Sequence, residues 1–287
     1  MCEQCGCGST PGTVRVTDSG RTISSRPAAA TTVEVHAALL AENDRVAAHN
    51  RAHFEEHGVL AVNLMSSPGS GKTSLLEATL DAAAGRWRIG VIEGDLETEN
   101  DALRIRAKGV PAVQITTGQA CHLDAGMVHD ALHALDLHAL DILFIENVGN
   151  LVCPASFDLG QSANVTLLSV TEGDDKPAKY PVMFRAADLV LLAKSDLLDV
   201  LDDFDPAKAR RHVRELANPA PVLAISARRP ATLRPWLDWL EGGLAAVRAH
   251  PGMHAHPQGH SHRHEHSHGH EHPETAPHSH PRAADPA

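Results

Sequence analysis

The sequence predicts an α/β fold with a mostly parallel sheet, and two observations carry this prediction. Short, continuous apolar runs alternate along the chain with segments of helical periodicity. Continuous apolar runs are typical of strands covered on both faces, and parallel strands need crossover connections that are usually helices. We therefore expect three layers, with helices on both faces of the sheet. The expected strands cover residues 59–65, 89–92, 113–115, 142–145, 165–170, 189–192 and 222–225.

Helical periodicity predicts the connections and one helix at each end of the sheet region. Apolar residues recur at helical intervals from Thr32 to about His57, and Gly58 follows as a stop signal. A last amphipathic helix covers about 233–248 and carries Trp236 and Trp239. The connecting helices are expected at 74–84, 101–108, 124–135 and 207–216.

Both ends of the chain differ from this core in composition. Residues 1–30 combine a cysteine and glycine cluster with a linker rich in Ser, Thr, Gly, Pro and Ala, which is typical of a flexible tether. Residues 251–287 hold 11 His and 6 Pro but no Leu, Ile, Val, Phe or Trp, so they cannot join a packed core. We predict a metal-binding N-terminal segment and linker over 1–30, one domain over 31–250, and a disordered His-rich tail over 251–287.

Charge and hydropathy exclude two classes of protein. Lys and Arg number 25 against 36 Asp and Glu, for a formal net charge of -11, so the clustered basic surface that binds nucleic acid is not expected. No apolar stretch approaches the roughly 18 residues that a membrane helix requires. The first five residues have neither the basic nor the apolar region of a signal peptide. We expect a cytoplasmic protein that binds no nucleic acid and does not enter a membrane.

A phosphate-binding loop follows the first expected strand. Ser66-Ser67-Pro68-Gly69-Ser70-Gly71-Lys72-Thr73 lies between that strand and a helix, which is the context of a P-loop. Backbone N–H groups and the helix N-terminus surround the phosphates there, Lys72 neutralises β- and γ-phosphate charge, and the Thr73 hydroxyl binds Mg²⁺. Ser66 stands where this motif usually has its first glycine. The residues expected to contact the nucleotide are Pro68, Gly69, Ser70, Gly71, Lys72, Thr73 and Ser74.

Acidic residues end two other expected strands and should lie beside this loop. Glu146 ends one of them, and Gly149 follows three residues later, where its N–H can meet a γ-phosphate and detect its loss. The other, Glu93-Gly94-Asp95, leads to Asp101 at a helix start. Either Asp95 or Asp101 can hold Mg²⁺ through water, and the sequence does not choose between them. The catalytic group is predicted to be Lys72, Thr73, Glu146 and Gly149.

Base recognition is expected late in the sheet. Ala193-Lys194-Ser195-Asp196 is similar to the Asn-Lys-x-Asp guanine motif of GTPases, in which the aspartate accepts two hydrogen bonds from guanine and the lysine stem lies along the ring. Ala193 replaces the Asn and removes one stabilising hydrogen bond, but Lys194 and Asp196 favour GTP over ATP. Further on, Ser226 and Ala227 resemble the last GTPase loop, whose backbone N–H contacts the guanine carbonyl.

The chain has 21 His and five Cys, and their distribution indicates metal binding. Three thiols close to the N-terminus, with a nitrogen from the backbone or chain terminus, can form a four-coordinate site that is square-planar for Ni²⁺ or tetrahedral for Zn²⁺. These thiols belong to Cys2, Cys5 and Cys7. The alternating imidazoles of the tail suit storage of Ni²⁺, Zn²⁺ or Cu²⁺.

A further metal site is expected near the nucleotide. Cys121, His122 and Cys153 follow strands whose carboxyl ends can meet at the nucleotide edge of the sheet. Two thiols and one imidazole are fewer ligands than a closed site needs. A water molecule or a second subunit should therefore complete this site.

Taken together, these motifs resemble the hydrogenase nickel-incorporation GTPases of the HypB family. The resemblance rests on the N-terminal Cys-x-x-Cys-Gly-Cys, the phosphate loop, and the blocks 91–95, 121–125 and 146–155, and it covers about 31–250 plus the cysteine cluster. It implies a P-loop NTPase fold. It also implies a metallochaperone that hydrolyses GTP to GDP and phosphate while helping to load nickel into the large subunit of nickel–iron hydrogenase.

The same resemblance implies roles for the cysteines and a set of partners. The N-terminal thiols match a tight nickel site, and Cys121, His122 and Cys153 match a nickel or zinc site at a nucleotide-dependent dimer interface. The expected partners are a second copy of the chain when GTP is bound, the hydrogenase large subunit and a companion nickel-maturation chaperone. Two features depart from the family: Ala193 in the guanine motif and the C-terminal place of the His tract. Turnover should be slow, since no arginine finger or water-positioning Gln is evident. It should depend on Mg²⁺, which the Thr73 hydroxyl binds.

Three other functions share part of these features. A small-molecule kinase needs the P-loop but not the cysteine and histidine groups. A nickel-storage protein needs only the tail. A sister chaperone for urease has the same fold, but the N-terminal cysteine cluster favours hydrogenase.

Deletion of residues 251–287 removes 11 of the 21 histidines but no expected core residue and no part of the P-loop. Folding and GTP turnover should barely change, while nickel capacity per chain, measured by equilibrium dialysis, should fall by several weakly held ions. Cells carrying the deletion should mature hydrogenase normally when nickel is plentiful and poorly when it is scarce. Loss of GTPase activity, or failure at every nickel concentration, would contradict a storage role.

Overall fold

The structure is a computed structural model that describes residues 17–18, 21–22, 32–96, 100–118 and 120–249. The N-terminal cysteines Cys2, Cys5 and Cys7 and the His-rich tail lie outside the described residues, so the predictions made for them stay predictions, as do the domain boundaries. One short antiparallel pair, β1 (Thr17–Asp18) and β2 (Arg21–Thr22), lies inside the segment predicted to be a flexible tether.

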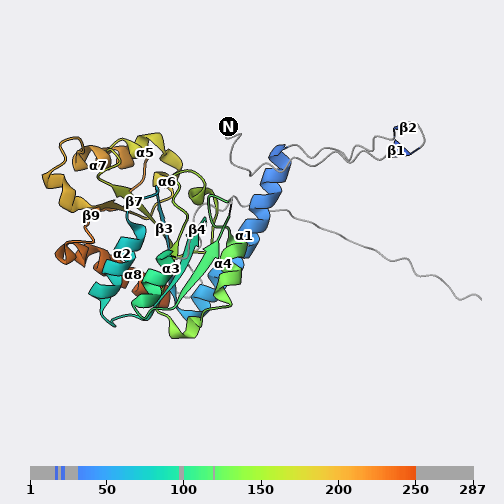
Figure 1. Ribbon diagram of the computed structural model, residues 1–287, viewed down its shortest axis with the longest axis horizontal. Coiled ribbons are helices and arrows are strands. Elements are labelled where there is room, and N and C mark those ends of the chain that lie inside the picture. Colours follow the sequence, from blue (N-terminus) through green and yellow to red (C-terminus); the bar gives the residue numbers. More distant parts are fainter. Residues whose placement is uncertain (1–16, 19–20, 23–31, 97–99, 119, 250–287) are drawn as a thin grey trace, which may run out of the picture. The chain divides into compact units, whose positions relative to one another are not determined.

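A sheet of seven strands forms the centre of the described structure (Figure 1). Its order is β5-β4-β6-β3-β7-β8-β9, and each neighbouring pair is parallel. All seven expected strands are present, and the predicted α/β class is confirmed. Their bounds are β3 (Leu60–Ser66), β4 (Ile89–Asp95), β5 (Ala112–Thr116), β6 (Ile142–Glu146), β7 (Ala163–Ser169), β8 (Leu189–Ala193) and β9 (Val222–Ala224).

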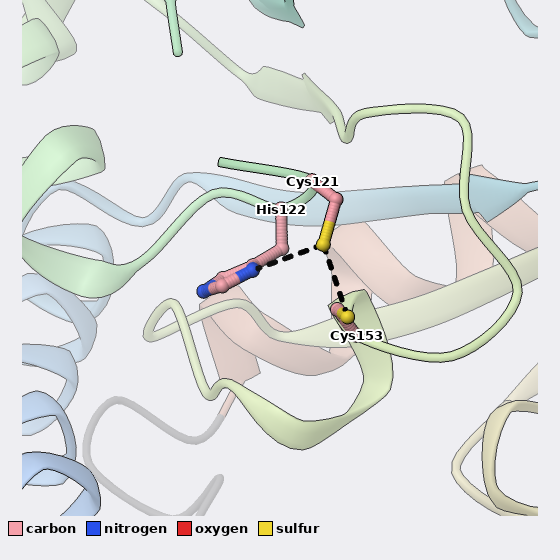
Figure 2. A group of neighbouring side chains, drawn as sticks. All are labelled: Cys121, His122 and Cys153. Carbon is pink, nitrogen blue, oxygen red and sulfur yellow. Dashed lines mark hydrogen bonds between the residues drawn. The ribbon is translucent and has the colours of Figure 1, made fainter. Parts of the chain in front are cut away.

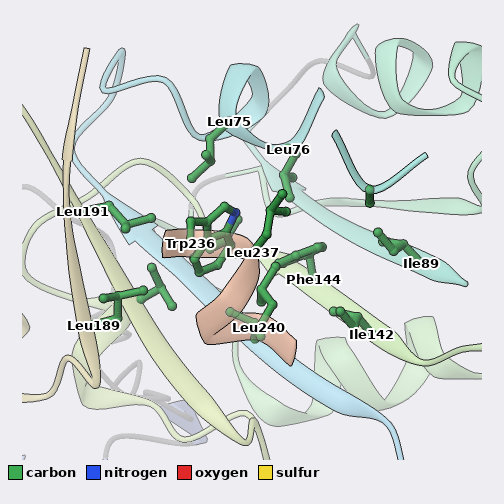
Figure 3. Close-up of a cluster of buried hydrophobic side chains, with 14 of the residues drawn as sticks. Leu75, Leu76, Ile89, Ile142, Phe144, Leu189, Leu191, Trp236, Leu237 and Leu240 are labelled. Carbon is green, nitrogen blue, oxygen red and sulfur yellow. The ribbon is translucent and has the colours of Figure 1, made fainter. Parts of the chain in front are cut away.

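Three helices cover one face of this sheet: α2 (Lys72–Ala83), α3 (Asn100–Ala107) and α8 (Arg234–Ala249). Figure 3 shows Trp236 of α8 near Leu75 of α2, and its ring centre lies 6.2 Å from that of the strand residue Phe144. Trp236 is fully buried, and its Nε1 donates to Thr79 Oγ1 at 2.9 Å. This hydrogen bond ties α8 to the helix that follows the phosphate loop.

The opposite face carries two groups of helices. α1 (Thr32–His57) and α4 (Ala125–Leu132) pack over β4, β6 and β3, while α6 (Pro181–Arg185) and α7 (Pro206–Glu215) pack over β7 and β8. Two asparagines of α1 fix the start of α4: Asn43 Oδ1 accepts from Ala125 N at 2.9 Å, and Asn50 Nδ2 donates to Ala125 O at 2.9 Å. No helix in the described part of the chain is long and apolar enough to cross a membrane.

The expected helices form with small shifts at their ends. α4 is shorter than predicted because it ends at Leu132, where a turn replaces the last part of the periodic segment. Helix α5 (Lys176–Lys179) and α6 were not predicted, since elements of four and five residues carry too little periodicity to be seen in sequence. Single 3₁₀ turns lie at Leu137–Ala139, Pro154–Ser156, Ser195–Asp199 and Pro230–Leu233.

Replacing Trp236 by Ala should lower the free energy of unfolding by about 3–5 kcal/mol, because it opens a cavity beneath α8 and removes the hydrogen bond to Thr79. Urea denaturation followed by circular dichroism measures the change. The matched control is Trp239→Ala, since Trp239 stacks on Trp236 with ring centres 5.6 Å apart but is only partly buried. The Trp239→Ala variant should lose clearly less free energy of unfolding than Trp236→Ala. Equal losses in the two variants would contradict the central place of Trp236 in the core.

Candidate functional site

The loop after β3 has the backbone conformation of a phosphate-binding loop. Gly69 and Gly71 have φ angles of 73° and 102°, a region that residues with side chains rarely adopt. Lys72 Nζ donates to Ser66 Oγ at 3.0 Å, and Ser70 donates to the same hydroxyl. Ser66, which stands in place of the usual glycine, is therefore an internal partner of the loop and holds Lys72 across it.

Three oxygen-bearing side chains lie beside the loop at the edge of the sheet. Thr73 Oγ1 donates to Glu146 Oε1 at 3.0 Å, and Lys72 Nζ lies 4.0 Å from the same oxygen. Glu93 of β4 stands opposite Glu146 of β6 in the register of the sheet, and both are buried. No role was predicted for Glu93; its signal in the sequence is an acid that directly follows the apolar residues Val91 and Ile92 of the same strand.

Burial controls the charge of this glutamate pair. It raises the pKa of Glu146, against the attraction of the Lys72 ammonium. Burial and the neighbouring Glu146 carboxylate raise the pKa of Glu93 to about 10, so Glu93 is protonated at neutral pH. Glu146 Oε2 and Glu93 Oε1 accept no hydrogen bond from any amide, ammonium or alcohol group of the described residues. Together with the Thr73 hydroxyl, the Glu146 carboxylate fits Mg²⁺, which prefers oxygen ligands.

The structure places both aspartates proposed for Mg²⁺ on the same cavity. This cavity of about 450 Å³ is lined by the phosphate loop, the ends of β4 and β6 and the start of α3. Asp95 Oδ1 accepts the N–H of Leu96 at 2.7 Å, whereas Asp101 Oδ1 accepts from Arg104 Nη1 at 2.9 Å.

Gly149 brings the segment after β6 against the phosphate loop. A Cβ atom at this position would lie 2.9 Å from Pro68 Cα and 3.0 Å from Pro68 N. Any larger residue would force two backbones apart, so only glycine allows the close approach. Gly149 also lines the cavity that holds Lys72 and Thr73.

A second cavity, of about 590 Å³, lies on the other side of the loop. Lys194 has a left-handed φ of 57°, and its Nζ donates to Gly69 O at 2.7 Å. Asp196 Oδ1 accepts from the Ser226 hydroxyl, which holds the pKa of that carboxyl below its ordinary value. The cavity is lined by the residues predicted to bind the base and by part of the loop, among them Ser70, Gly71, Ser74, Lys194, Asp196, Ser226 and Ala227.

The structure brings together the three metal ligands predicted near the nucleotide, although they come from two separate loops (Figure 2). We call these residues, Cys121, His122 and Cys153, the inner group. The two sulfur atoms of Cys121 and Cys153 are 3.1 Å apart without a disulfide, and Cys121 Sγ lies 3.9 Å from His122 Nδ1. The His122 ring stacks on Phe157 with ring centres 3.9 Å apart, and burial lowers the pKa of His122. The imidazole is therefore neutral at pH 7, as metal binding requires.

The sulfur separation is close to what one metal ion demands. Two thiolates at about 2.3 Å from one ion lie roughly 3.3–3.8 Å apart for bond angles between 90° and 109°. Cys121 and Cys153 thus need only a small adjustment to share an ion. His122 supplies the nitrogen donor that borderline ions such as Ni²⁺ and Zn²⁺ accept alongside sulfur.

One side chain joins the nucleotide cavity to this metal group. Asn147 follows Glu146 directly, and its Oδ1 accepts from Leu123 N, next to His122, at 3.1 Å. Its Nδ2 donates to Asn63 Oδ1 at 3.2 Å, inside the sheet. No role was predicted for Asn147; its signal in the sequence is a lone amide between the strand-ending Glu146 and Gly149.

Known proteins similar to this chain show the family to which it belongs. Residues 60–224 match the family model described as the CobW/HypB/UreG nucleotide-binding domain, which is a family of P-loop GTPases. The hydrogenase maturation factor HypB of Azotobacter vinelandii is 56% identical over 203 residues, which cover 71% of this chain and 67% of that protein. HypB of Escherichia coli K12 is 53% identical over 209 residues, covering 73% and 72%.

The similar solved structures are also of HypB proteins. The crystal structure of HypB from Helicobacter pylori in complex with nickel has a TM-score of 0.70 at 42% identity, and the match covers 75% of this chain and 100% of that one. HypB from Archaeoglobus fulgidus gives a TM-score of 0.67 at 40% identity, covering 71% and 100%. The chain therefore belongs to the HypB family of hydrogenase maturation factors, which confirms the family resemblance inferred from its motifs.

Replacing Asn147 by Ala should lower the free energy of unfolding by about 1–3 kcal/mol, because it leaves the buried N–H of Leu123 and Oδ1 of Asn63 without this partner. Chemical denaturation measures the change. The matched control is Asn150→Ala in the same segment, where Asn150 Oδ1 accepts only the exposed Val152 N–H. That control should change stability by less than about 0.5 kcal/mol, and an Asn147 loss of the same small size would refute the bridging role.

Proposed function

We propose that this chain is a GTP-hydrolysing nickel metallochaperone for the large subunit of nickel–iron hydrogenase, in which the bound nucleotide controls metal binding by Cys121, His122 and Cys153. The observation that carries the proposal is the hydrogen bond from Leu123 N to Asn147 Oδ1, because it connects the segment after Glu146 with the segment that contains two of the metal ligands. The nickel ion is the cargo of this reaction. The protein would act in the cytoplasm.

The nucleotide would lie across both cavities. Asp196 and Lys194 would hold the guanine edge and ring, with Ser226 and Ala227 against its carbonyl, while the loop from Pro68 to Ser74 surrounds the phosphates. Lys72 would neutralise charge on the β- and γ-phosphates. Mg²⁺, held by Thr73 and through water by Asp95 or Asp101, would neutralise charge that develops on the phosphate oxygens. Among the described residues that line the cavity on the γ-phosphate side, the one arginine is Arg104, and it pairs with Asp101 and Glu77. Hydrolysis would therefore be slow, because no free arginine would stabilise the charge of the transition state.

The γ-phosphate would set the position of the segment from Glu146 to Cys153. Gly149 already touches Pro68, so its N–H is close to the place where this phosphate must lie. When the phosphate leaves, the segment loses that contact and can move. Cys153 is part of the same segment, so its sulfur would move relative to Cys121, and the affinity for nickel would change with nucleotide state.

The ligand count supports a dimer. Two thiolates and one imidazole leave one position of a four-coordinate ion to water or to a second copy of the chain. A homodimer formed with GTP would place two such groups together, and either Ni²⁺ or Zn²⁺ suits these donors. The N-terminal thiols of Cys2, Cys5 and Cys7 would hold nickel tightly, and a companion nickel-maturation chaperone and the hydrogenase large subunit would receive it in turn.

Nickel and zinc titration of the full chain in its apo, GDP-bound and GTP-bound states tests this proposal, with oligomeric state followed by analytical ultracentrifugation. The affinity of the inner group should differ at least about fivefold between GDP and GTP states, the lower range of a coupled pair of sites. Cys153→Ser should abolish this difference while leaving one tight nickel ion per chain. An unchanged difference in Cys153→Ser would contradict the coupling.

Lys72→Ala provides the complementary control. It should abolish GTP hydrolysis, because the phosphate charge is no longer neutralised, while tight nickel binding by Cys2, Cys5 and Cys7 stays intact. Loss of that tight binding in the folded variant would show that the two functions are not independent.

A further inference from the structure

Six histidines form a patch on one side of the domain. We define the histidine patch as His49, His53 and His57 of α1, His129 of α4, His133 directly after α4, and His138 of the 3₁₀ turn Leu137–Ala139. The spacing of four residues along α1 and α4 puts the imidazoles of each helix on one face. Ring centres are 4.6 Å apart for His49 and His53, 5.0 Å for His49 and His129, and 4.2 Å for His57 and His138.

Three side chains on α1 offer ligand atoms at the spacing of a metal site. One ligand atom each from His53, Glu56 and His57 lies within 4.8 Å of the others. Glu56 is exposed and both histidines are half-buried, so an ion in solution can reach them. Imidazole and carboxylate donors without sulfur suit borderline divalent ions such as Ni²⁺ and Zn²⁺, and bind them less tightly than thiolates.

Hydrogen bonds prepare one of these imidazoles for binding. His57 Nδ1 lies 2.7 Å from the carbonyl oxygen of His53, which can only accept, so in the neutral ring Nδ1 carries the proton and Nε2 offers its lone pair. A metal-binding histidine commonly donates its other ring N–H to a backbone carbonyl in this way.

His129 on α4 has the same arrangement. Its Nδ1 lies 3.1 Å from Asn50 Oδ1, and Asn50 Nδ2 already donates to the carbonyls of Ala125 and Leu159. Asn50 Oδ1 is therefore the acceptor, and the neutral ring of His129 carries its proton on Nδ1.

We propose that His53, Glu56 and His57 form a separate transition-metal site on the outer face of α1, which takes a borderline divalent ion such as Ni²⁺ or Zn²⁺, with His138 beside His57 as a further imidazole ligand. The site shares no ligand with the group of Cys121, His122 and Cys153. Its donors predict a weaker and more readily exchanged ion than the thiolates hold. The rest of the histidine patch offers neighbouring imidazoles to which such an ion can pass.

Histidine acylation by diethyl pyrocarbonate tests this site within the full chain, because every other metal site stays in place and only local protection is read. Trypsin cuts after Arg51 and Lys72, and the peptide 52–72 contains His53 and His57 but no other histidine. With Zn²⁺ added, acylation of this peptide should slow at least about tenfold. His212 of α7, which pairs with Glu215, serves as the internal control and should react at an unchanged rate.

Two matched variants test the ligand set. Glu56→Gln should raise the Zn²⁺ concentration for half-protection at least about tenfold, since even outer-shell partners of a metal ligand contribute that much. Glu55→Gln, one residue away on the same helix, should leave it unchanged. Equal rates with and without Zn²⁺, protection that appears only together with His212, or the same response from both variants would overturn the proposal.

This test is independent of the proposed nucleotide switch. Cys153→Ser should leave protection of the peptide 52–72 unchanged, because the two groups have no ligand in common. Loss of protection in that variant would show that the signal belongs to the inner cysteine group and would also overturn the proposal.

Discussion

The carboxamide of Asn147 is the contact on which the arrangement of the two sites depends. It lies fully buried at the end of β6, where one oxygen accepts the N–H of Leu123 and the amide nitrogen donates to Asn63. A buried polar group that loses its partner costs about 1–3 kcal/mol, so neither neighbouring segment can move without finding a replacement. The predicted nucleotide-binding segment after β6 and the predicted metal ligands Cys121 and His122 thus lie at the two ends of one hydrogen-bonded connection.

This connection continues into the core of the sheet. Asn63 Nδ2 donates to Asn164 Oδ1 at 2.9 Å, and Gln161 Nε2 donates to the same oxygen at 3.1 Å, so amides on β3 and around β7 join the network. A polar network in a core of low dielectric favours one defined arrangement over intermediate ones. Such a network suits a segment that must adopt discrete positions when a phosphate is present or absent.

The sequence was sufficient for elements whose cause is local, but not for those that depend on strand order. The seven strands are continuous apolar runs, and the loop from Ser66 to Thr73 carries its motif in adjacent residues. By contrast, β6 lies between β4 and β3 although β5 precedes it in the chain, so the facing of Glu93 and Glu146 follows from register alone. The sequence shows that His49, His53 and His57 are spaced four residues apart. It does not show that α4 and His138 lie beside them in the fold.

The two metal groups among the described residues differ in what can change them. Cys153 lies on the segment that follows Gly149, which closely approaches Pro68 of the phosphate loop. His53 and His57 lie on α1, a long helix that Asn43 and Asn50 fasten to α4. A ligand shifts an equilibrium only between states that it binds differently, so a nucleotide can alter the first group directly, whereas the helical group offers it no moving ligand. The proposed switch thus predicts nucleotide-coupled release from the group of Cys121, His122 and Cys153, and constant, weaker holding of an ion by the group on α1.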